Sequence, residues 1–334
     1  MTDRPQSTAP FVVVHDDGPA LAALKGTVIA IGNFDGVHRG HQAVIAAARE
    51  RAAGLGRPAA ALTFEPHPRR ILRPDLPMFR LTEPPAKLRL LAATAIKGVL
   101  VMTFDAALAA VSAEEFIART LVERLAVAGA TIGFDFHFGK NRGGSPAFLA
   151  EQGRRYGFPV DIIPPLEDEG RPVSSSVIRA ALAAGRVVEA AELLGYPWFV
   201  TGPVIHGDQR GRDLGYPTAN LRLDPACELK HGIYAVRVGL DGIVHDGVAS
   251  FGRRPTFGEG APLLEVHLFD FSGDLYGRTI DVAFIGWIRA EMRFEGIDEL
   301  IRHMDDDSRL ARAVLARAPD VFPPILGSAG VVGT

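Results

Sequence analysis

The chain has 334 residues, 47% of them hydrophobic, and a net charge of −3. This length exceeds what one core usually organises, so we expect two domains. The single cysteine, Cys227, excludes a disulfide framework, and the weak charge argues against the basic footprint of most nucleic-acid-binding proteins. With polar residues at 1–10 and no apolar run near the ~20 residues of a membrane span, we expect a cytoplasmic protein with small-molecule substrates and neither a nucleic-acid nor a membrane partner.

The first half of the chain alternates strand-like and helix-like segments. Residues 27–31 are apolar and largely β-branched, as in a short buried strand, and the alanine-rich residues 42–53 predict a helix. The alternation continues with strands expected at 59–64, 98–102 and 130–133, and helices at 85–95, 113–125, 180–184 and 187–194. This rhythm predicts an α/β fold with a parallel sheet, in which ligands bind beyond the carboxyl ends of the strands.

A glycine-rich turn at 32–41 joins the first of these strands to its helix. It reads Gly-Asn-Phe-Asp-Gly-Val-His-Arg-Gly-His, and it places His38 and His41 on the first helical turn. There the two rings share a face beside free backbone N–H groups and the positive end of the helix dipole, where phosphate binds well. Gly36 and Gly40 would let a phosphate approach the backbone closely. Two histidines at this spacing are also common as surface or structural residues, so the interpretation as a phosphate-binding site depends on the surrounding glycine-rich turn.

The pattern changes after the tripeptide Gly-Tyr-Pro at 195–197. Short alternating strands are expected at 199–206, 232–240, 243–251, 263–271 and 279–287, followed by a helix at 297–318. Such runs, separated by Gly, Asp and Pro, are typical of an antiparallel sheet or a closed barrel. In the helix, we expect Leu300, Ile301, Met304 and Leu310 to contact the core.

The turn at 32–41 resembles the nucleotidyltransferase signature of the bacterial riboflavin kinase/FMN adenylyltransferase family. Further family motifs occur in family order: Thr-Phe-Glu-Pro-His-Pro at 63–68, Leu-Thr at 81–82, Gly-Phe-Asp-Phe-His-Phe-Gly at 133–139 and Ser-Ser-Ser-Val-Ile-Arg at 174–179. The resemblance implies a Rossmann-like nucleotidyltransferase domain at 11–195. Its reaction would be attack of the FMN phosphate on the α-phosphorus of ATP, giving FAD and pyrophosphate.

The same resemblance implies roles for single residues. His38 and His41 would donate N–H groups to the ATP phosphates, and Arg179, expected on the first turn after a serine cap, would hold the triphosphate. The expected nucleotide-binding residues of this domain are Gly32, Phe34, Gly36, Asp135 and Ser175. Asp135 also fits a plain turn residue, and the serines at 174–176 also fit simple helix capping. Ser176 departs from the threonine usual in the family.

The polar loop at 202–221 resembles the riboflavin kinase domain, which would span 198–326. In its extended Pro-Thr-Ala-Asn segment, Thr218 and Asn220 point the same way and offer two neutral oxygens to Mg²⁺, with phosphates and water completing the shell. The resemblance adds Gly207 and Arg212 as nucleotide-binding residues of the loop. Without the Pro-Thr-Ala-Asn segment, four glycines in a polar loop would favour a flexible connection.

Glu265 interrupts the apolar strand expected at 263–271. A carboxylate there is costly unless it is paired or functional, and the alternative is an outward-facing edge glutamate. The family match makes Glu265 the catalytic base that takes the proton from the terminal ribityl hydroxyl of riboflavin, which then attacks the γ-phosphorus of ATP. Ser-Phe-Gly at 250–252 departs from the usual Asn-Ile-Gly, which leaves the details of the flavin pocket open.

Together these motifs predict a bifunctional enzyme that uses ATP and Mg²⁺, with riboflavin, FMN and FAD as its substrates and products. Two other readings stay open: an adenylyltransferase for another phosphorylated vitamin, with the barrel as a binding domain, and a non-catalytic flavin-binding or regulatory protein. The sequence also leaves the oligomeric state open, a homo-oligomer included.

Overall fold

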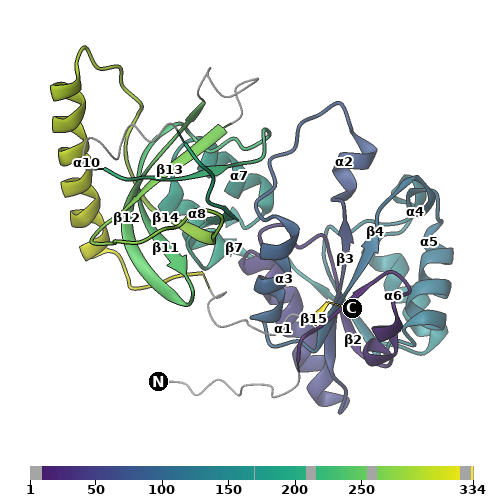
Figure 1. Cartoon of the computed structure of the whole chain (residues 1–334). Helices are drawn as coiled ribbons and strands as arrows, with labels where there is room; N and C mark the ends of the chain where they lie inside the picture. Colours follow the sequence, from purple (N-terminus) through teal and green to yellow (C-terminus); the bar gives the residue numbers. More distant parts are fainter. Residues whose placement is uncertain (1–9, 169, 208–215, 254–261, 324–331, 334) are drawn as a thin grey trace. The chain divides into compact units, whose positions relative to one another are not determined.

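The computed structural model describes residues 10–168, 170–207, 216–253, 262–323 and 332–333. Its contacts divide the chain into two compact units (Figure 1). The first unit comprises Met1–Met78, Pro84–Ser174 and Ser328–Thr334, and the second unit comprises Phe79–Glu83 and Ser175–Gly327. This division assigns residues 175–194 to the second unit, whereas the domains expected from the sequence were 11–195 and 198–326. Those boundaries stay a prediction about the functional domains.

The first unit is built on a parallel sheet, as the strand and helix alternation predicts. Its strands are β1 (Val12–His15), β2 (Val28–Ile31), β3 (Ala59–Glu65), β4 (Gly98–Thr103), β5 (Gly129–Gly133), β6 (Val160–Ile163) and β15 (Val332–Gly333), in the order β15-β1-β4-β3-β2-β5-β6. Helical segments connect them: η1 (Pro19–Leu24), α1 (Arg39–Gly54), α2 (Pro68–Leu72), α3 (Pro84–Ala92), α4 (Ala106–Ala109), α5 (Ala113–Glu115), η2 (Phe116–Arg124), η3 (Lys140–Arg142) and α6 (Pro146–Tyr156). A short hairpin, β7 (Glu167–Asp168) and β8 (Arg171–Pro172), precedes the end of this unit.

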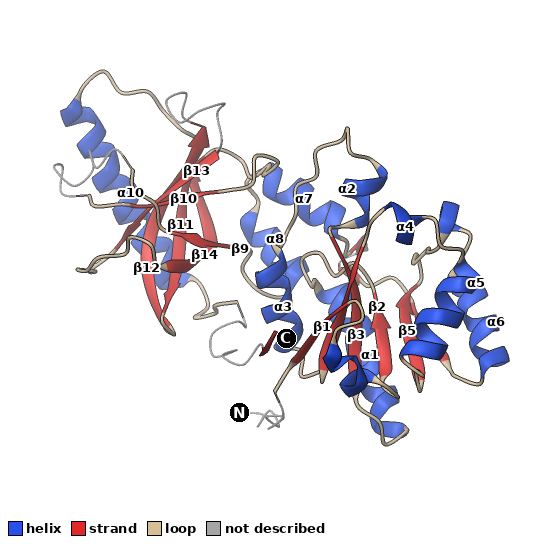
Figure 2. Ribbon diagram, turned by 45° about the vertical axis from the view of Figure 1, so that its right-hand side comes forward, coloured by secondary structure: helices blue, strands red, loops and turns tan. Residues whose placement is uncertain are grey.

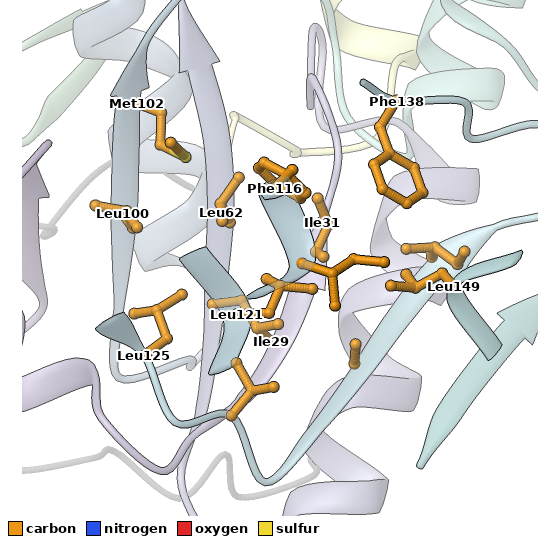
Figure 3. Packing of buried hydrophobic residues seen from close by; sticks show 14 of the residues in the cluster. Ile29, Ile31, Leu62, Leu100, Met102, Phe116, Leu121, Leu125, Phe138 and Leu149 are labelled. Atoms are coloured by element: carbon orange, nitrogen blue, oxygen red, sulfur yellow. The ribbon is translucent and has the colours of Figure 1, made fainter. Parts of the chain in front are cut away.

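Helices cover both faces of this sheet (Figure 2). On one face, Ile132 belongs to the same buried cluster as Phe116 and Leu121 of η2, and Figure 3 shows Phe116 and Leu121 among strand residues such as Ile31 and Leu62. On the other face, the hydroxyl of Thr131 donates to the carbonyl of Val44 in α1 at 3.1 Å. Because neighbouring strand residues point to opposite faces, the sheet is buried from both sides.

The order of the strands creates a switch point between β2 and β5. The chain runs from β2 to β3 to β4 in one direction, and β5 then returns to the opposite side of β2, with Ile31 paired to Ile132. The loops that follow β2 and β5 therefore leave the same edge of the sheet side by side. In open parallel sheets this is where ligands bind.

The helix expected at 113–125 is present as one continuous helix from Ala113 to Arg124, but from Phe116 onward, in η2, its hydrogen bonds have π-helical spacing. The N–H of Leu125 bonds to the carbonyl of Thr120, five residues back, which is the π-helical spacing. Residues 116–117, 120–121 and 125 are buried. Their spacing is compatible with both an α-helix and a π-helix, so the sequence pattern does not distinguish the two.

The second unit contains an antiparallel, nearly closed barrel, which confirms the change of fold expected after 195–197. Its strands are β9 (Phe199–Pro203), β10 (Ala219–Arg222), β11 (Gly232–Leu240), β12 (Ile243–Arg253), β13 (Pro262–Leu268) and β14 (Thr279–Arg289), in the order β10-β13-β12-β11-β14-β9. A bridge between Ile205, just after β9, and Asn220 of β10 links the two ends of this sheet. Closure of this kind removes exposed strand edges.

Helices α7 (Ser175–Ala183) and α8 (Val187–Leu194) belong to this second unit, together with the segment Phe79–Glu83. Trp198 packs against the segment Phe79–Glu83 and is 2% exposed. Its indole Nε1–H donates to the carbonyl of Leu81 at 2.8 Å, and its ring meets the edge of Phe79, with centroids 5.7 Å apart. A segment from the middle of the first unit's sequence thus completes the core around Trp198.

Helix α10 (Ile297–Arg317) packs on the outer face of the barrel, and of the residues expected to contact the core, Leu300, Ile301 and Met304 are half-buried. Its buried side chains are Asp307, Ala311 and Leu315, whereas Leu310 is 42% exposed. Asp307 forms a two-point ion pair with Arg289 of β14, with N–O distances of 2.8 and 2.6 Å. The expectation for Leu310 was therefore wrong, because the packed face is defined by an ion pair and a small residue rather than by the largest apolar side chains. Within the described residues, no helix has the length and mean hydropathy needed to cross a membrane.

Candidate functional site

Helix α1 begins directly after the histidine motif, and His38 is its N-cap. The Nδ1 atom of His38 accepts a hydrogen bond from the backbone N–H of His41 at 3.3 Å, and the residue is 6% exposed. A ring nitrogen that accepts carries no proton, so the proton of this ring lies on Nε2. His38 can therefore offer one N–H donor at the positive end of the helix, where anions bind.

The two histidines form one packed unit. Their rings are stacked, with centroids 3.6 Å apart and an interplanar angle of 20°. The ring of Phe34, which is 1% exposed, meets His41 edge-on with a centroid distance of 5.4 Å. This packing fixes the orientation of both imidazoles, and it gives Phe34 a supporting contact beneath His41.

The loop before α1 holds an unusual backbone. Gly36 has φ of +83°, and the non-glycine residues Phe34 and Val37 have φ of +50° and +36°. Such conformations are unfavourable for side-chain-bearing residues and cluster at functional sites. A Cβ on Gly40 would lie 3.1 Å from the His38 ring, and one on Gly32 would lie 3.2 Å from the Phe34 ring. These two glycines are needed for packing within the loop itself.

Asp135 lies in the exposed loop that follows β5. Its carbonyl is 2.9 Å from Nδ1 of His137, and its carboxylate lies near the backbone of Gly133. The strand pairing places this loop at the same sheet edge as the histidine motif. The contacts fit a turn residue as well as a nucleotide-binding one, so the role of Asp135 stays a prediction.

Ser175 and Arg179 lie in α7 of the second unit. The helix begins at Ser175, so Arg179 is its fifth residue and not a first-turn residue as expected. Its Nε–H donates to the carbonyl of Phe79 at 2.6 Å. The expectation that Arg179 lies on the first turn was therefore wrong, because Ser175 and Ser176 are already part of the helix. Its role as a phosphate ligand rests on the family motif alone.

The sequence reasoning missed Lys87, which is 3% exposed in α3. Its ammonium forms an ion pair with Glu65 at the end of β3. Lys87 lies on the buried side of the helix with Ala86, Leu90 and Leu91. The signal that could have identified Lys87 is its position among apolar residues of a helix, since buried lysines are rare unless paired.

The second unit brings Glu265 and Asn220 together. They are directly paired residues of the antiparallel strands β13 and β10, and Ser250 of β12 pairs with Glu265 from the other side. Paired residues share a face of the sheet. Their neighbours Leu221 and Leu264 are 0% exposed and fill the opposite, inner face of the barrel. Glu265 is thus part of a polar row of side chains across three strands.

The amide of Asn220 has the properties of a ligand group. It is 4% exposed, and its Oδ1 has no hydrogen-bond partner among the residues that the structure describes. Its Nδ2–H donates to the carbonyl of Thr218 at 3.3 Å, and a Cβ on Gly207 would lie 2.5 Å from the same nitrogen. A buried acceptor without a partner is costly, and neutral oxygens are ligands that Mg²⁺ accepts. The donor set around Asn220 therefore fits this ion.

The segment that carries Thr218 is held in place from both sides. The hydroxyl of Tyr216 bonds to Asp305 of α10, and Nδ1 of His267 lies 3.0 Å from the carbonyl of Pro217. Burial raises the pKa of the Tyr216 hydroxyl most, and the hydrogen bond to Asp305 raises it further. The remaining expected residue, Arg212, lies outside the described residues.

Comparisons with known proteins agree with this two-site arrangement. The family model described as FAD synthetase matches residues 21–177, and the one described as riboflavin kinase matches residues 194–315. The chain is 43% identical over 87% of its length to the bifunctional riboflavin kinase/FMN adenylyltransferase of Pseudomonas fluorescens, covering 94% of that protein. It is 40% identical over 87% of its length to the enzyme of the same name from Escherichia coli K12, covering 93% of it.

The crystal structure of a macrolide-efflux protein from Streptococcus pneumoniae is also similar, with a TM-score of 0.80 and 32% identity over 90% of this chain and 98% of that one. By both of its halves, the chain belongs to the family of bifunctional riboflavin kinase/FMN adenylyltransferases.

Proposed function

We propose that this protein phosphorylates riboflavin to FMN in its second unit and adenylylates FMN to FAD, both at the expense of ATP. The observation that supports the proposal is that the chain holds two separate sets of candidate phosphate-binding residues. One set is the His38 and His41 pair at the start of α1, and the other is the Asn220 and Glu265 pair in the barrel. One set alone would support a single phosphate-transfer reaction.

In adenylyl transfer, the FMN phosphate attacks the α-phosphorus of ATP, so the protein needs no nucleophile of its own. Its contribution is orientation and stabilisation of negative charge on the phosphates. His38 and His41 would donate to the phosphate oxygens at the positive end of α1, supported by the backbone of Gly32 and Gly36. Phe34 would act through the ring contact that orients His41.

Three further residues are proposed to bind the nucleotide in this reaction. Arg179 would hold the triphosphate through its guanidinium, which matches phosphate geometry with two donors, and Ser175 would add a hydroxyl. Asp135 would act near the adenylyl group. These assignments rest on the family motifs at 133–139 and 174–179.

In riboflavin phosphorylation, Glu265 would take the proton from the terminal ribityl hydroxyl, and the resulting oxygen nucleophile would attack the γ-phosphorus of ATP. Asn220 Oδ1 and the hydroxyl of Thr218 would hold Mg²⁺, which supplies charge neutralisation on the phosphate oxygens when bound. Gly207 would let the loop backbone approach the Asn220 amide, and Arg212 would contact the nucleotide. The buried, unpartnered oxygen of Asn220 supports this assignment.

We further propose that the protein works in the cytoplasm on small molecules, without a nucleic-acid or membrane partner. The ATP dependence of both reactions and the net charge of −3 support this setting. Fractionation of cells of the source organism, with antibody detection of the chain, tests it directly.

Product analysis tests the function. The purified full chain is incubated with riboflavin, ATP and Mg²⁺, and separately with FMN, ATP and Mg²⁺, and flavins are resolved by liquid chromatography. Both FMN and FAD are expected from riboflavin, and FAD with pyrophosphate is expected from FMN. A chain that binds flavins but forms neither product would be a binding protein. A chain that adenylylates a different phosphorylated vitamin but not FMN would refute the proposed substrate.

A further inference from the structure

Lys87 joins two segments that border the histidine motif. Its ammonium nitrogen lies 3.4 Å from the carbonyl oxygen of Asn33, in the loop after β2. It also lies 3.3 Å from the hydroxyl oxygen of Thr63 and 3.5 Å from the carbonyl oxygen of Phe64, and it forms an ion pair with Glu65, all at the end of β3. The side chain is 3% exposed, so these contacts form away from bulk water.

The carbonyl of Asn33 is the acceptor on which this network converges. The hydroxyl of Thr63, which is 0% exposed, donates to the same oxygen at 3.1 Å. Two buried donors on one carbonyl fix the orientation of the peptide between Asn33 and Phe34. Phe34 is the first residue of the loop with a positive φ, at +50°, and its ring supports His41. A rotation of this peptide would therefore shift the ring on which His41 rests.

The conformation of the loop needs such support. Phe34 and Val37 both have backbone angles that non-glycine residues rarely adopt, and such residues persist only where their surroundings hold them. A charged donor makes stronger hydrogen bonds than a neutral one, and a low local dielectric strengthens them further. The ammonium of Lys87 is such a donor, and it comes from α3, which lies outside the histidine motif.

We propose that Lys87 is a positioning residue for FAD formation, which holds the histidine loop in its reactive conformation through the carbonyl of Asn33. It is not a ligand of the nucleotide. This inference rests on the proposed adenylyl-transfer function of the first unit. It assigns to α3 and the end of β3 a part in the reaction beyond the packing of the sheet.

The competing explanation is that Lys87 and Glu65 form an ordinary buried ion pair. Removing one partner of such a pair is destabilising because the other charge is left buried, whereas replacing both is often neutral. The pair of variants Lys87→Met and Glu65→Gln/Lys87→Met separates the two explanations. The double variant leaves no buried charge at this site, but it also has no ammonium to donate to Asn33.

The test measures both reactions of the full chain, together with thermal unfolding, for wild type, Lys87→Met, Glu65→Gln/Lys87→Met and Thr63→Val. Lys25→Met, at an exposed position, is the matched control. We expect the double variant to unfold near the wild-type temperature but to form FAD about 10²-fold more slowly, as for a misplacement of catalytic groups. The loss should fall on kcat, with much smaller changes in KM for ATP and FMN, and riboflavin phosphorylation should be unchanged. Thr63→Val, which removes one donor to Asn33, should lower the rate about three- to tenfold.

Wild-type FAD kinetics in the double variant would overturn the inference and leave the ion pair as purely structural. An equal loss of both reactions in a folded protein would also overturn it. If both Lys87 variants fail to fold, Thr63→Val decides, because it preserves the volume and the ion pair, and a normal rate there refutes the positioning role. Absence of FAD formation in the wild type would instead refute the proposed function, so the two failures are distinguishable.

Discussion

Replacing Asn220 by leucine is expected to slow riboflavin phosphorylation by about 10²-fold with little change in the stability of the fold. The two side chains have nearly the same shape. The change removes a buried oxygen that lacks a hydrogen-bond partner among the described residues, which relieves about 1–3 kcal/mol of desolvation cost. It also removes the 3.3 Å bond from Nδ2 to the carbonyl of Thr218, worth about 0.5–1.5 kcal/mol. The difference therefore lies between a loss of about 0.5 kcal/mol and a gain of about 2.5 kcal/mol in the stability of the second unit.

Calorimetry of the purified chain measures this balance. For a unit of about 150 residues, 1 kcal/mol shifts the melting temperature by about 2–4 °C, so the variant should melt between about 2 °C below and about 10 °C above the wild-type temperature. Adding ATP and Mg²⁺ at about 100 times the dissociation constant stabilises a binding protein by about 2.7 kcal/mol, and this increment should shrink in the variant's second unit. FMN formation should fall by about 10²-fold, as for a loss of a few kcal/mol of metal-derived stabilisation.

A comparison with Thr131→Val sharpens the result. Thr131 is likewise buried, at 0% exposed, but its hydroxyl donates to the carbonyl of Val44 at 3.1 Å, so its removal should destabilise the first unit and leave FMN formation unchanged. If Asn220→Leu lowers stability by more than about 2 kcal/mol, the amide is a structural group and the reasoning fails. Retention of normal FMN formation would refute its role as a metal ligand.

Three further outcomes are expected. His41→Ala should slow FAD formation by about 10²–10³-fold, as for loss of one preorganised donor, while FMN still forms from riboflavin, and an unchanged FAD rate would refute the assignment. Glu265→Gln should slow riboflavin phosphorylation by about 10²–10⁴-fold while conversion of supplied FMN to FAD persists, and normal phosphorylation would make the glutamate structural. A fragment of residues 175–334 should melt higher and stay more soluble than one of 197–334, because only the longer one keeps α7 and α8, where the carbonyl of Leu182 accepts a hydrogen bond from the N–H of Lys230, and equal melting in a scanning fluorescence assay would contradict this packing argument.

Most elements of the fold follow from local patterns in the sequence. The strand at 27–31 and the helix after it were predictable, because the β-branched run favours a strand and the alanine-rich run that follows it favours a helix. Five strands of the barrel were predictable for the same reason, from alternation between turn residues, whereas β10 was not among the expected strands. The site on α1 could be expected too, since a glycine-rich turn and a helix start are adjacent in the chain.

Features that depend on distant pairing could not be predicted. The pairing of Asn220 with Glu265 depends on the register of β10 and β13, which nothing within either strand fixes. The buried face of α10 is determined by the ion pair of Asp307 with Arg289 on another element. A prediction from hydrophobicity alone therefore placed Leu310 in the core wrongly. The position of Arg179 within α7 was misjudged because serines occur both before a helix and in its first turn.

The segment Phe79–Glu83 gives the second unit an unusual order of assembly. The partner of Leu81, Trp198, lies 117 residues later in the chain. At synthesis rates of about 5–20 residues per second, Leu81 leaves the ribosome roughly 6–23 s before Trp198 does. During that interval the segment cannot enter its native core, although the residues around it are available to fold. Completion of the second unit therefore requires the closure of a long loop that contains β4, β5 and β6 of the first unit, a step that costs entropy and slows folding.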